Sequence, residues 1–485
     1  MSLATRTITS ISWKGSTNIL RIVILLARSI ILARLLAVEV FGIYASAVVV
    51  VTITAVLFNF GLGGAFLYIS NQGVSEKQAA AVHFTLNLLF KLIWAAILIL
   101  FAFFFMQGLE QIALIVVALA NGLFMLTYTP QLILSKRVVH RRLALMDVTS
   151  DIFASAVAVL LAFRGAGLWA LLATNIIAGM VSVFVLYIYR PVWVPHFLFS
   201  RELIRRYLAF GWRNVWADFF QVLLNRLDDF WTAVYLGAYS MGLYSRAYAF
   251  ALYPQKILAE PANSVTMGVY AEISHDRHKL SQAFFRINAL LLRAGFLLAG
   301  IFALIAPEFI HLIIGDKWLP FLEAFRLMLL FTMLEPVKLT ISYLFVAVGK
   351  PEIVVRIRLI QLVVLGIGLF VMGLLWDIAG VALAVDLMLF IGIALLLWRA
   401  REFVDISVRK LFQAPLLALL IAGISVLLTL KLPFATISYW HSGIVKLILF
   451  VPIYILLLYW QEKRDFHNMI RALDIASWKK RLWPR

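Results

Sequence analysis

Three basic residues near the start of the chain, Lys14, Arg21 and Arg28, are spaced seven residues apart. In an α-helix this spacing places their side chains within about 20° of one another on successive double turns. Arginine guanidinium groups donate paired hydrogen bonds that match the oxygens of phosphate groups. The stripe therefore predicts a binding track for an anionic ligand. The alternative is a ladder of ion pairs to other helices, with Lys14 extending to the membrane interface.

Other basic residues also fall inside apolar segments, where a cation needs water, a partner or an anionic ligand. Each could line the same cavity as the stripe or form a structural ion pair, and Asp228 and Asp229 follow Arg226 closely enough to be its partners. These cations outnumber the embedded acids, which favours an anionic cargo over a cationic drug. They are Lys91, Arg213, Arg226, Arg246, Arg293 and Lys338.

Four embedded acids are candidates for coupling to a proton or sodium gradient. Glu335 also stands three residues before Lys338 and next to Pro336, so these two side chains could instead form a local pair at a helix break. The four candidates are Asp218, Glu260, Glu335 and Asp386.

The residue types that carry out catalysis or hold metals show no arrangement suited to either task. The eight histidines lack the spacing of metal ligands, and His275 and His278 fall in a predicted loop. No Walker-type phosphate loop is present, which argues against ATP hydrolysis, and the absence of cysteine excludes disulfides and thiolate sites. We therefore expect a transporter without a cofactor or a bound metal, and not an enzyme.

The segments that carry these residues have the composition of membrane-crossing helices. With 64% hydrophobic residues and a mean hydropathy of +0.97, the chain holds more apolar surface than a water-soluble fold of its size could bury. Taking about 20 apolar residues for one crossing, we predict an all-α integral membrane protein of about fourteen helices. They lie at residues 12–36, 40–69, 79–106, 110–134, 143–163, 167–189, 207–236, 240–271, 286–314, 320–348, 352–375, 378–398, 411–430 and 442–460.

Positive charge is distributed unevenly over the predicted connections between helices. Nearly all Lys and Arg residues outside the helices fall on one side, and the other side receives little beyond Arg164, Lys317 and Lys431. Because positive charge marks the cytoplasmic side, we expect a multi-pass protein of the inner, or cytoplasmic, membrane with both termini in the cytoplasm. The net charge of +19 is thus a topology signal and does not indicate nucleic-acid binding. Residues 461–485 fit an amphipathic helix on the inner leaflet or a disordered basic tail.

One segment recurs at a constant offset of 200 residues. Its copies join helices 1 and 2 and helices 7 and 8, so they occupy equivalent places in two six-helix halves of the same orientation. A second, weaker match relates residues 164–171 to residues 377–384, each between the fifth and sixth helix of its half. Parallel halves around a central cavity are an architecture of transporters. The matching residues are Leu36, Gly42, Tyr44 and Ala47, and Leu236, Gly242, Tyr244 and Ala247.

The repeat and the helix count suggest five regions. An N-terminal lobe of helices 1 to 6 covers residues 1–190, and a basic cytoplasmic connector covers residues 191–206. A C-terminal lobe of helices 7 to 12 covers residues 207–400, helices 13 and 14 cover residues 401–460, and the basic tail covers residues 461–485.

The repeated segment and its surroundings also resemble a known family. The run from Ile31 to Tyr44, followed by Phe60-Gly61-Leu62, resembles the opening of the polysaccharide transporter family, the Wzx-type flippases of O-antigen and exopolysaccharide. Residues 226–229, 236–237 and 242–247 resemble that family's seventh and eighth helices, and residues 306–318 resemble the exit of its ninth. The resemblance covers roughly residues 10–400. It implies two six-helix lobes, often followed by two extra helices, in the superfamily that also holds multidrug exporters and the lipid II flippase.

This resemblance implies a flippase for oligosaccharides linked to undecaprenyl diphosphate, working by alternating access in surface polysaccharide synthesis. The cationic stripe would then contact the diphosphate, and membrane lipids and assembly proteins such as a polymerase would be partners. Two alternatives remain, an ion-coupled multidrug or small-molecule exporter and a lipid II-type flippase. A membrane glycan polymerase or ligase is disfavoured because the predicted outer connections are short.

Overall fold

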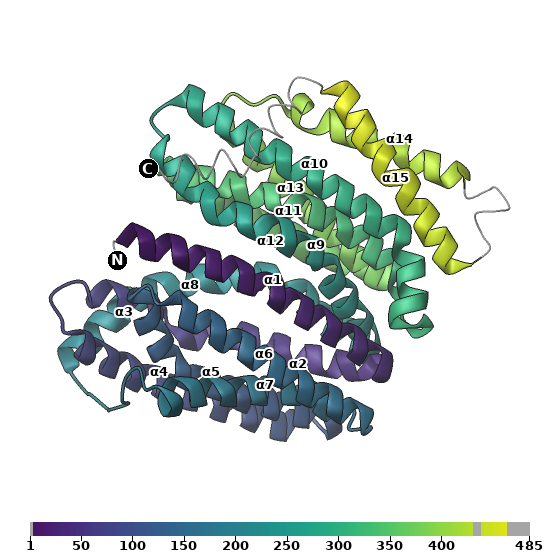
Figure 1. The fold of residues 1–485 in the computed structure, drawn as a ribbon. Helices are drawn as coiled ribbons and strands as arrows, with labels where there is room; N and C mark the ends of the chain where they lie inside the picture. Colours follow the sequence, from purple (N-terminus) through teal and green to yellow (C-terminus); the bar gives the residue numbers. More distant parts are fainter. Residues whose placement is uncertain (1–2, 430–437, 463–485) are drawn as a thin grey trace. The chain divides into compact units, whose positions relative to one another are not determined.

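A computed structural model describes residues 3–429 and 438–462 of the chain, without the side chains of residues 3–16, 213–214, 254 and 257–265. The predicted tail helix beyond residue 462 lies outside the described residues. The structure is built of helices α1 to α15 with short π- and 3₁₀-segments at several helix ends (Figure 1). The first half comprises α1 (Leu3–Leu35), α2 (Val38–Asn59), α3 (Leu62–Ile69), α4 (Glu76–Phe105), α5 (Gly108–Lys136), α6 (His140–Phe163), α7 (Leu168–Val183) and α8 (Arg201–Trp231). The second comprises α9 (Gly237–Glu272), α10 (Arg277–Phe309), α11 (Leu322–Ala347), α12 (Pro351–Gly368), α13 (Leu374–Ala400), α14 (Val408–Thr429) and α15 (Tyr439–Gln461).

All fourteen predicted helices are present, so the prediction of an all-α fold is confirmed. Among the described residues, ten helical stretches are long and apolar enough to cross a membrane. Helices α1, α8 and α9, each of which includes residues whose side chains are not described, are not among those ten. The chain is therefore a multi-pass membrane protein.

The predicted second helix is wrong in one respect, because it breaks into α2 and α3. Phe60 and Gly61, between the two, have φ angles of 47° and 56° in the left-handed region. The carbonyl of Phe60 faces α8, where a Cβ added to Gly211 would collide with it. The phenyl ring of Phe60 also lies 6.2 Å from the ring of Trp212 between centroids. The break thus coincides with a close approach of α8, which the apolar pattern of residues 40–69 does not reveal.

The basic connector is also partly helical. Helix α8 begins at Arg201, six residues before the predicted start, and the Ser200 hydroxyl accepts a hydrogen bond from the backbone N–H of Leu203 at 3.4 Å. A serine in this position satisfies one of the free amides of the first turn. The basic residues at 201, 205 and 206 therefore lie on the first turns of α8.

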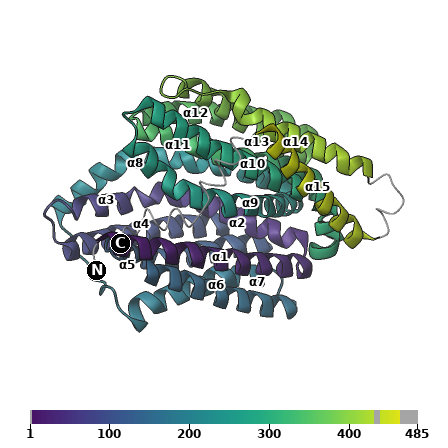
Figure 2. The ribbon, with the colours of Figure 1, turned by 45° about the horizontal axis from the view of Figure 1, so that its top comes forward.

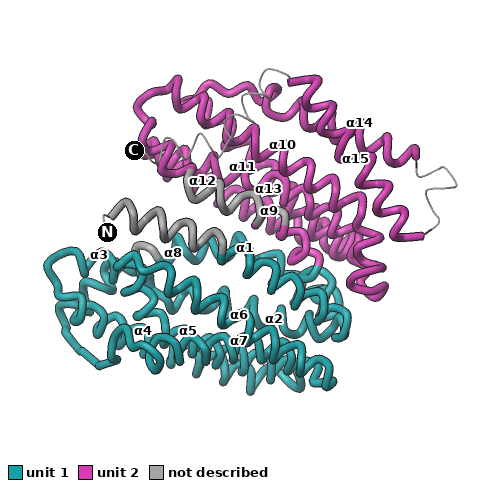
Figure 3. Tube along the Cα trace, in the orientation of Figure 1, with its two compact units in different colours: residues 1–246 teal, residues 247–485 magenta. Residues whose placement is uncertain are grey.

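The chain divides into two compact units, residues 1–246 and residues 247–485 (Figure 3). In the first unit, α2, α4, α5 and α7 bury a common core that includes Val51, Trp94, Leu114 and Leu172. In the second, α11 packs against α10 and α13 and is buried along much of its length. Helices α14 and α15 lie side by side and pack on α10 (Figure 2).

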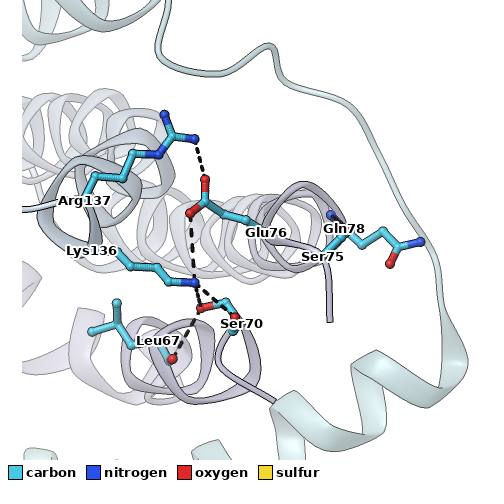
Figure 4. Close-up of polar contacts among 7 residues, drawn as sticks. All are labelled: Leu67, Ser70, Ser75, Glu76, Gln78, Lys136 and Arg137. Carbon is cyan, nitrogen blue, oxygen red and sulfur yellow. Dashed lines mark hydrogen bonds and ion pairs between the residues drawn. The ribbon is translucent and has the colours of Figure 1, made fainter. Parts of the chain in front are cut away.

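Residues of separate connections meet at one end of the first unit (Figure 4). Lys136 donates from Nζ to the carbonyl and hydroxyl oxygens of Ser70, at 3.1 and 2.8 Å. Arg137 forms an ion pair with Glu76 at 2.5 Å between Nη2 and Oε1. These contacts hold the connection after α3 beside the connection after α5.

An equivalent clamp exists in the second unit. Arg277, at the start of α10, donates to the Asp405 carboxylate at 2.9 Å and to the backbone carbonyls of Arg401 and Glu402. The connection after α13 is thereby fixed to the start of α10.

Candidate functional site

Arg21 lies on the face of α1 that packs along α6. Its Nε donates to Asp151 Oδ2 at 2.6 Å, and its Nη1 donates to Asp147 Oδ2 at 3.1 Å. About one third of the guanidinium-bearing side chain is still exposed. The structure therefore pairs this cation of the predicted stripe with two carboxylates without burying it.

Arg28 lies two turns further along α1 and is half-buried. Within the part of the chain that the structure describes, its side chain has no hydrogen-bond or ion-pair partner. The neighbouring Ser29 accepts a hydrogen bond at 3.5 Å from Nη1 of Arg246, which also lies 4.8 Å from the centroid of the Phe41 ring. Arg246 of α9 thus approaches α1 at the level of Arg28, and these two guanidinium groups could bind one anion together.

A buried polar network joins α8 to α9 next to this position. Arg226 donates from Nη1 to Asp229 Oδ2 at 2.9 Å, and the Tyr244 hydroxyl donates to Asp228 Oδ2 at 2.5 Å. Both carboxylates are buried. Of the two adjacent acids that the sequence suggested as partners of Arg226, Asp229 forms the ion pair.

The acids opposite Arg21 were not among the predicted site residues. Asp147 and Asp151 are four residues apart, so they project from the same face of α6. That spacing inside the predicted helix 143–163 is the signal that could have identified them. With these two acids counted, the excess of embedded cations over embedded acids is smaller than the sequence analysis suggested.

Lys91 is buried and hydrogen-bonded to a neighbouring helix. Its Nζ donates to the backbone carbonyl of Ala55 at 2.8 Å and lies 5.0 Å from the centroid of the Trp94 ring. The side chain is buried between α4 and α2. In this environment Lys91 is placed to stabilise helix packing.

Two predicted cations of the second unit also have acidic partners. Arg293 forms a two-pronged ion pair with Glu462, and its Nη1 donates to the carbonyl of Ala289 at 2.9 Å. Lys338 pairs with Glu335 at 2.7 Å between Nζ and Oε2, as the sequence suggested. The expected helix break is absent, because α11 continues through Pro336.

The remaining coupling candidates differ in their surroundings. Asp386 on α13 is buried, and neither of its carboxylate oxygens has a hydrogen-bond partner in the part of the chain that the structure describes. Asp218 is exposed on α8 and interacts electrostatically with Tyr128. The side chains of Lys14, Arg213 and Glu260 lie outside the described residues. Among described residues, no three His, Asp or Glu side chains are grouped to hold a metal ion.

The arrangement of α1, α6 and α9 therefore brings guanidinium groups together, and among the described residues Arg28 has no acidic partner. Residues 31–323 of the chain match the model of one protein family, which is described as polysaccharide biosynthesis protein.

Two curated proteins are similar to more than half of the chain. Succinoglycan biosynthesis transport protein ExoT of Rhizobium meliloti (strain 1021) is 27% identical over 295 residues, which cover 59% of this chain and 58% of that protein. Lipopolysaccharide biosynthesis protein WzxC of Escherichia coli (strain K12) is 23% identical over 369 residues, which cover 73% of this chain and 72% of that protein. The match with ExoT thus spans less than two thirds of its length.

Solved structures share the fold at low sequence identity. The lipid II flippase MurJ, in an inward closed conformation, superposes with a TM-score of 0.76 at 16% identity and covers 95% of this chain and 100% of its own. An inward-facing multidrug resistance transporter of the MATE family superposes with a TM-score of 0.60 at 17% identity and covers 81% of this chain and 98% of its own.

Proposed function

We propose that this chain, which belongs to the polysaccharide biosynthesis protein family, moves oligosaccharides linked to undecaprenyl diphosphate across the cytoplasmic membrane by alternating access. The lipid tail stays in the bilayer while the charged headgroup passes through the protein. Both termini face the cytoplasm in this proposal, and polysaccharide assembly proteins such as a polymerase receive the product. The names of ExoT and WzxC, which refer to transport and to polysaccharide synthesis, support this substrate class.

The proposal rests on one observation, that Arg28 has no partner among the described residues. A guanidinium inside a membrane-spanning helix is costly, by about 2.5 to 3.5 kcal/mol on insertion scales, unless water or an anion compensates it. Because Arg28 has no partner among the described residues, it is available to an external anion. A diphosphate offers the oxygen geometry that a guanidinium binds best.

The membrane potential can supply the driving force for such a headgroup. An inside-negative potential of 100 mV contributes about 2.3 kcal/mol for each negative charge moved outward. A headgroup with two negative charges therefore gains roughly twice that amount on the way out. Transport by this route needs no ATP site in the chain.

Glycan display in a strain that depends on this gene tests the proposal. Replacing both Arg21 and Arg28 by alanine is expected to abolish display while the protein still inserts at the wild-type level, and Arg28→Ala alone is expected to reduce display strongly. Arg206→Ala is the matched control, because Arg206 is exposed on α8 and pairs with Glu202 at 2.6 Å on its own helix. Wild-type display in the Arg21→Ala, Arg28→Ala double variant would reject the proposal.

The lipid II flippase and the multidrug exporters share the fold, so the fold does not separate the three substrate classes. A conditional deletion distinguishes them. Loss of a polysaccharide flippase removes surface glycan, loss of a lipid II flippase stops growth, and loss of a drug exporter changes drug susceptibility.

A further inference from the structure

The guanidinium of Arg21 lies between two carboxylates, and this arrangement has a consequence for any anion that it binds. We infer that Asp147 and Asp151 determine the affinity of the anion site by competing with the substrate's phosphates for Arg21. This inference rests on the proposed function, because it takes the diphosphate as the ligand.

The contacts leave part of Arg21 available. Asp151 occupies Nε and Asp147 occupies Nη1, at 2.6 and 3.1 Å. The third nitrogen, Nη2, donates to no residue that the structure describes. A phosphate can therefore make a first contact at Nη2 and then replace a carboxylate, since both groups present paired oxygens to the guanidinium.

The exposure of these side chains makes such replacement feasible. The exposed fractions are 34% for Arg21, 40% for Asp147 and 15% for Asp151. Where water and salt reach them, as the proposed path for the headgroup requires, ion pairs with this much exposed surface are weak.

The contrast with Arg293 and Glu462 is informative, because those side chains are only 6% and 11% exposed. Separating that pair would leave a charge buried without a partner, which is strongly unfavourable. Of these two groups, the one at Arg21 therefore has the properties of an exchangeable ion pair.

The charges of the group also oppose permanent binding. Two carboxylates contact the Arg21 guanidinium, so a diphosphate seated at Arg28 reaches Arg21 only in competition with them. A transporter requires binding strong enough to admit its cargo and weak enough to release it. The acid pair supplies the competing partner that Arg21 returns to when the headgroup leaves.

Binding of farnesyl diphosphate, a prenyl diphosphate without sugar, tests the inference. The protein is reconstituted in nanodiscs of zwitterionic lipid and titrated by calorimetry at fixed salt. We expect the Asp147→Asn, Asp151→Asn double variant to bind more tightly than wild type, on the order of fivefold. Each single variant is expected to bind more tightly too, with the larger effect for Asp151→Asn because its contact with Arg21 is shorter and less exposed.

The matched control is the Glu202→Gln, Glu402→Gln double variant. It also removes two exposed carboxylates that pair with arginines, Arg206 and Arg399. We expect it to bind as wild type does, which separates local competition from a general change in net charge. If the double aspartate variant does not fold, as judged by thermal unfolding, the two single variants carry the same test.

The outcomes separate this inference from the proposed function. Affinity equal to or weaker than wild type in folded aspartate variants overturns the competition, because a purely structural role for the acids predicts that result. If wild type binds and Arg28→Ala binds less tightly at the same time, the anion site itself stands. If neither wild type nor the aspartate variants bind the diphosphate, both ideas fail.

Discussion

Gly42 and Gly242, separated by 200 residues, each lie against the backbone of the other copy of the repeat. A Cβ added to Gly42 would collide with the carbonyl of Ala238, and one added to Gly242 would collide with the carbonyl of Val38. Val38 and Ala238 are also 200 residues apart. The contact is therefore reciprocal, as expected where two related segments pack about a two-fold axis. The two copies touch within residues 1–246.

This close approach predicts that Gly42→Ala is destabilising. The added methyl group forces the two backbones apart at the crossing of α2 and α9, and overpacking of this kind typically costs about 1 to 3 kcal/mol. The free energy of unfolding in detergent, or the midpoint of thermal unfolding, measures the effect. Gly242→Ala is expected to behave in the same way, because its contact is the counterpart.

Gly122 provides the control for this prediction. It lies in α5, also in the first unit, and a Cβ there would meet nothing within 4 Å. Gly122→Ala should be neutral or slightly stabilising, by up to about 1 kcal/mol from helix propensity. Equal unfolding midpoints for Gly42→Ala and Gly122→Ala would contradict the close approach.

Apolar length and basic connections were enough to predict all fourteen helices, because a membrane requires about 20 apolar residues for each crossing. They were not enough to predict the break at Phe60 and Gly61. That break accompanies the approach of Gly211 on α8, a contact between residues distant in sequence. The local pattern of apolar residues does not indicate such a contact. The same limit explains why the repeat was visible in the sequence and the contact between its copies was not.

Glu462 directly follows α15, so its ion pair with Arg293 holds the end of α15 against α10. We expect the contributions of the two side chains to the free energy of unfolding to be strongly coupled. Arg293→Gln and Glu462→Gln should each lower the free energy of unfolding by about 3 to 5 kcal/mol, because each leaves a buried charge without its partner. The double variant should lose less than the sum of the two single losses. A double-mutant cycle in detergent measures this coupling. Additive losses would mean that the two side chains do not interact.

Lys91 allows a test that separates a packing role from a substrate role. Lys91→Met keeps the length of the side chain and removes the hydrogen bond to the Ala55 carbonyl, so we expect a stability loss of about 1 to 2 kcal/mol. Glycan display should remain near the wild-type level at matched protein abundance. Loss of display without loss of stability would instead place Lys91 in contact with the cargo.

The sequence identified the embedded cations but could not distinguish paired from unpaired ones. Arg28 and Arg293 are the same residue type in similar apolar surroundings, yet only Arg293 meets a carboxylate among the described residues. Its partner, Glu462, is 169 residues away in sequence. Asp147 and Asp151, the partners of Arg21, could have been predicted more easily, because two acids four residues apart on one helix form a pattern in the local sequence.

Asp386 gives the last prediction. This residue is only 3% exposed, and neither carboxylate oxygen has a hydrogen-bond partner among the described residues. No ion pair is lost on replacement, so Asp386→Asn should change the free energy of unfolding by less than about 1 kcal/mol or increase it. Glu335→Gln is the matched control, because it separates Lys338 from its partner and is expected to cost about 3 kcal/mol or more. Thermal unfolding of the two variants under one set of conditions decides the matter. A loss at Asp386→Asn as large as that at Glu335→Gln would show that this carboxylate has a charged partner.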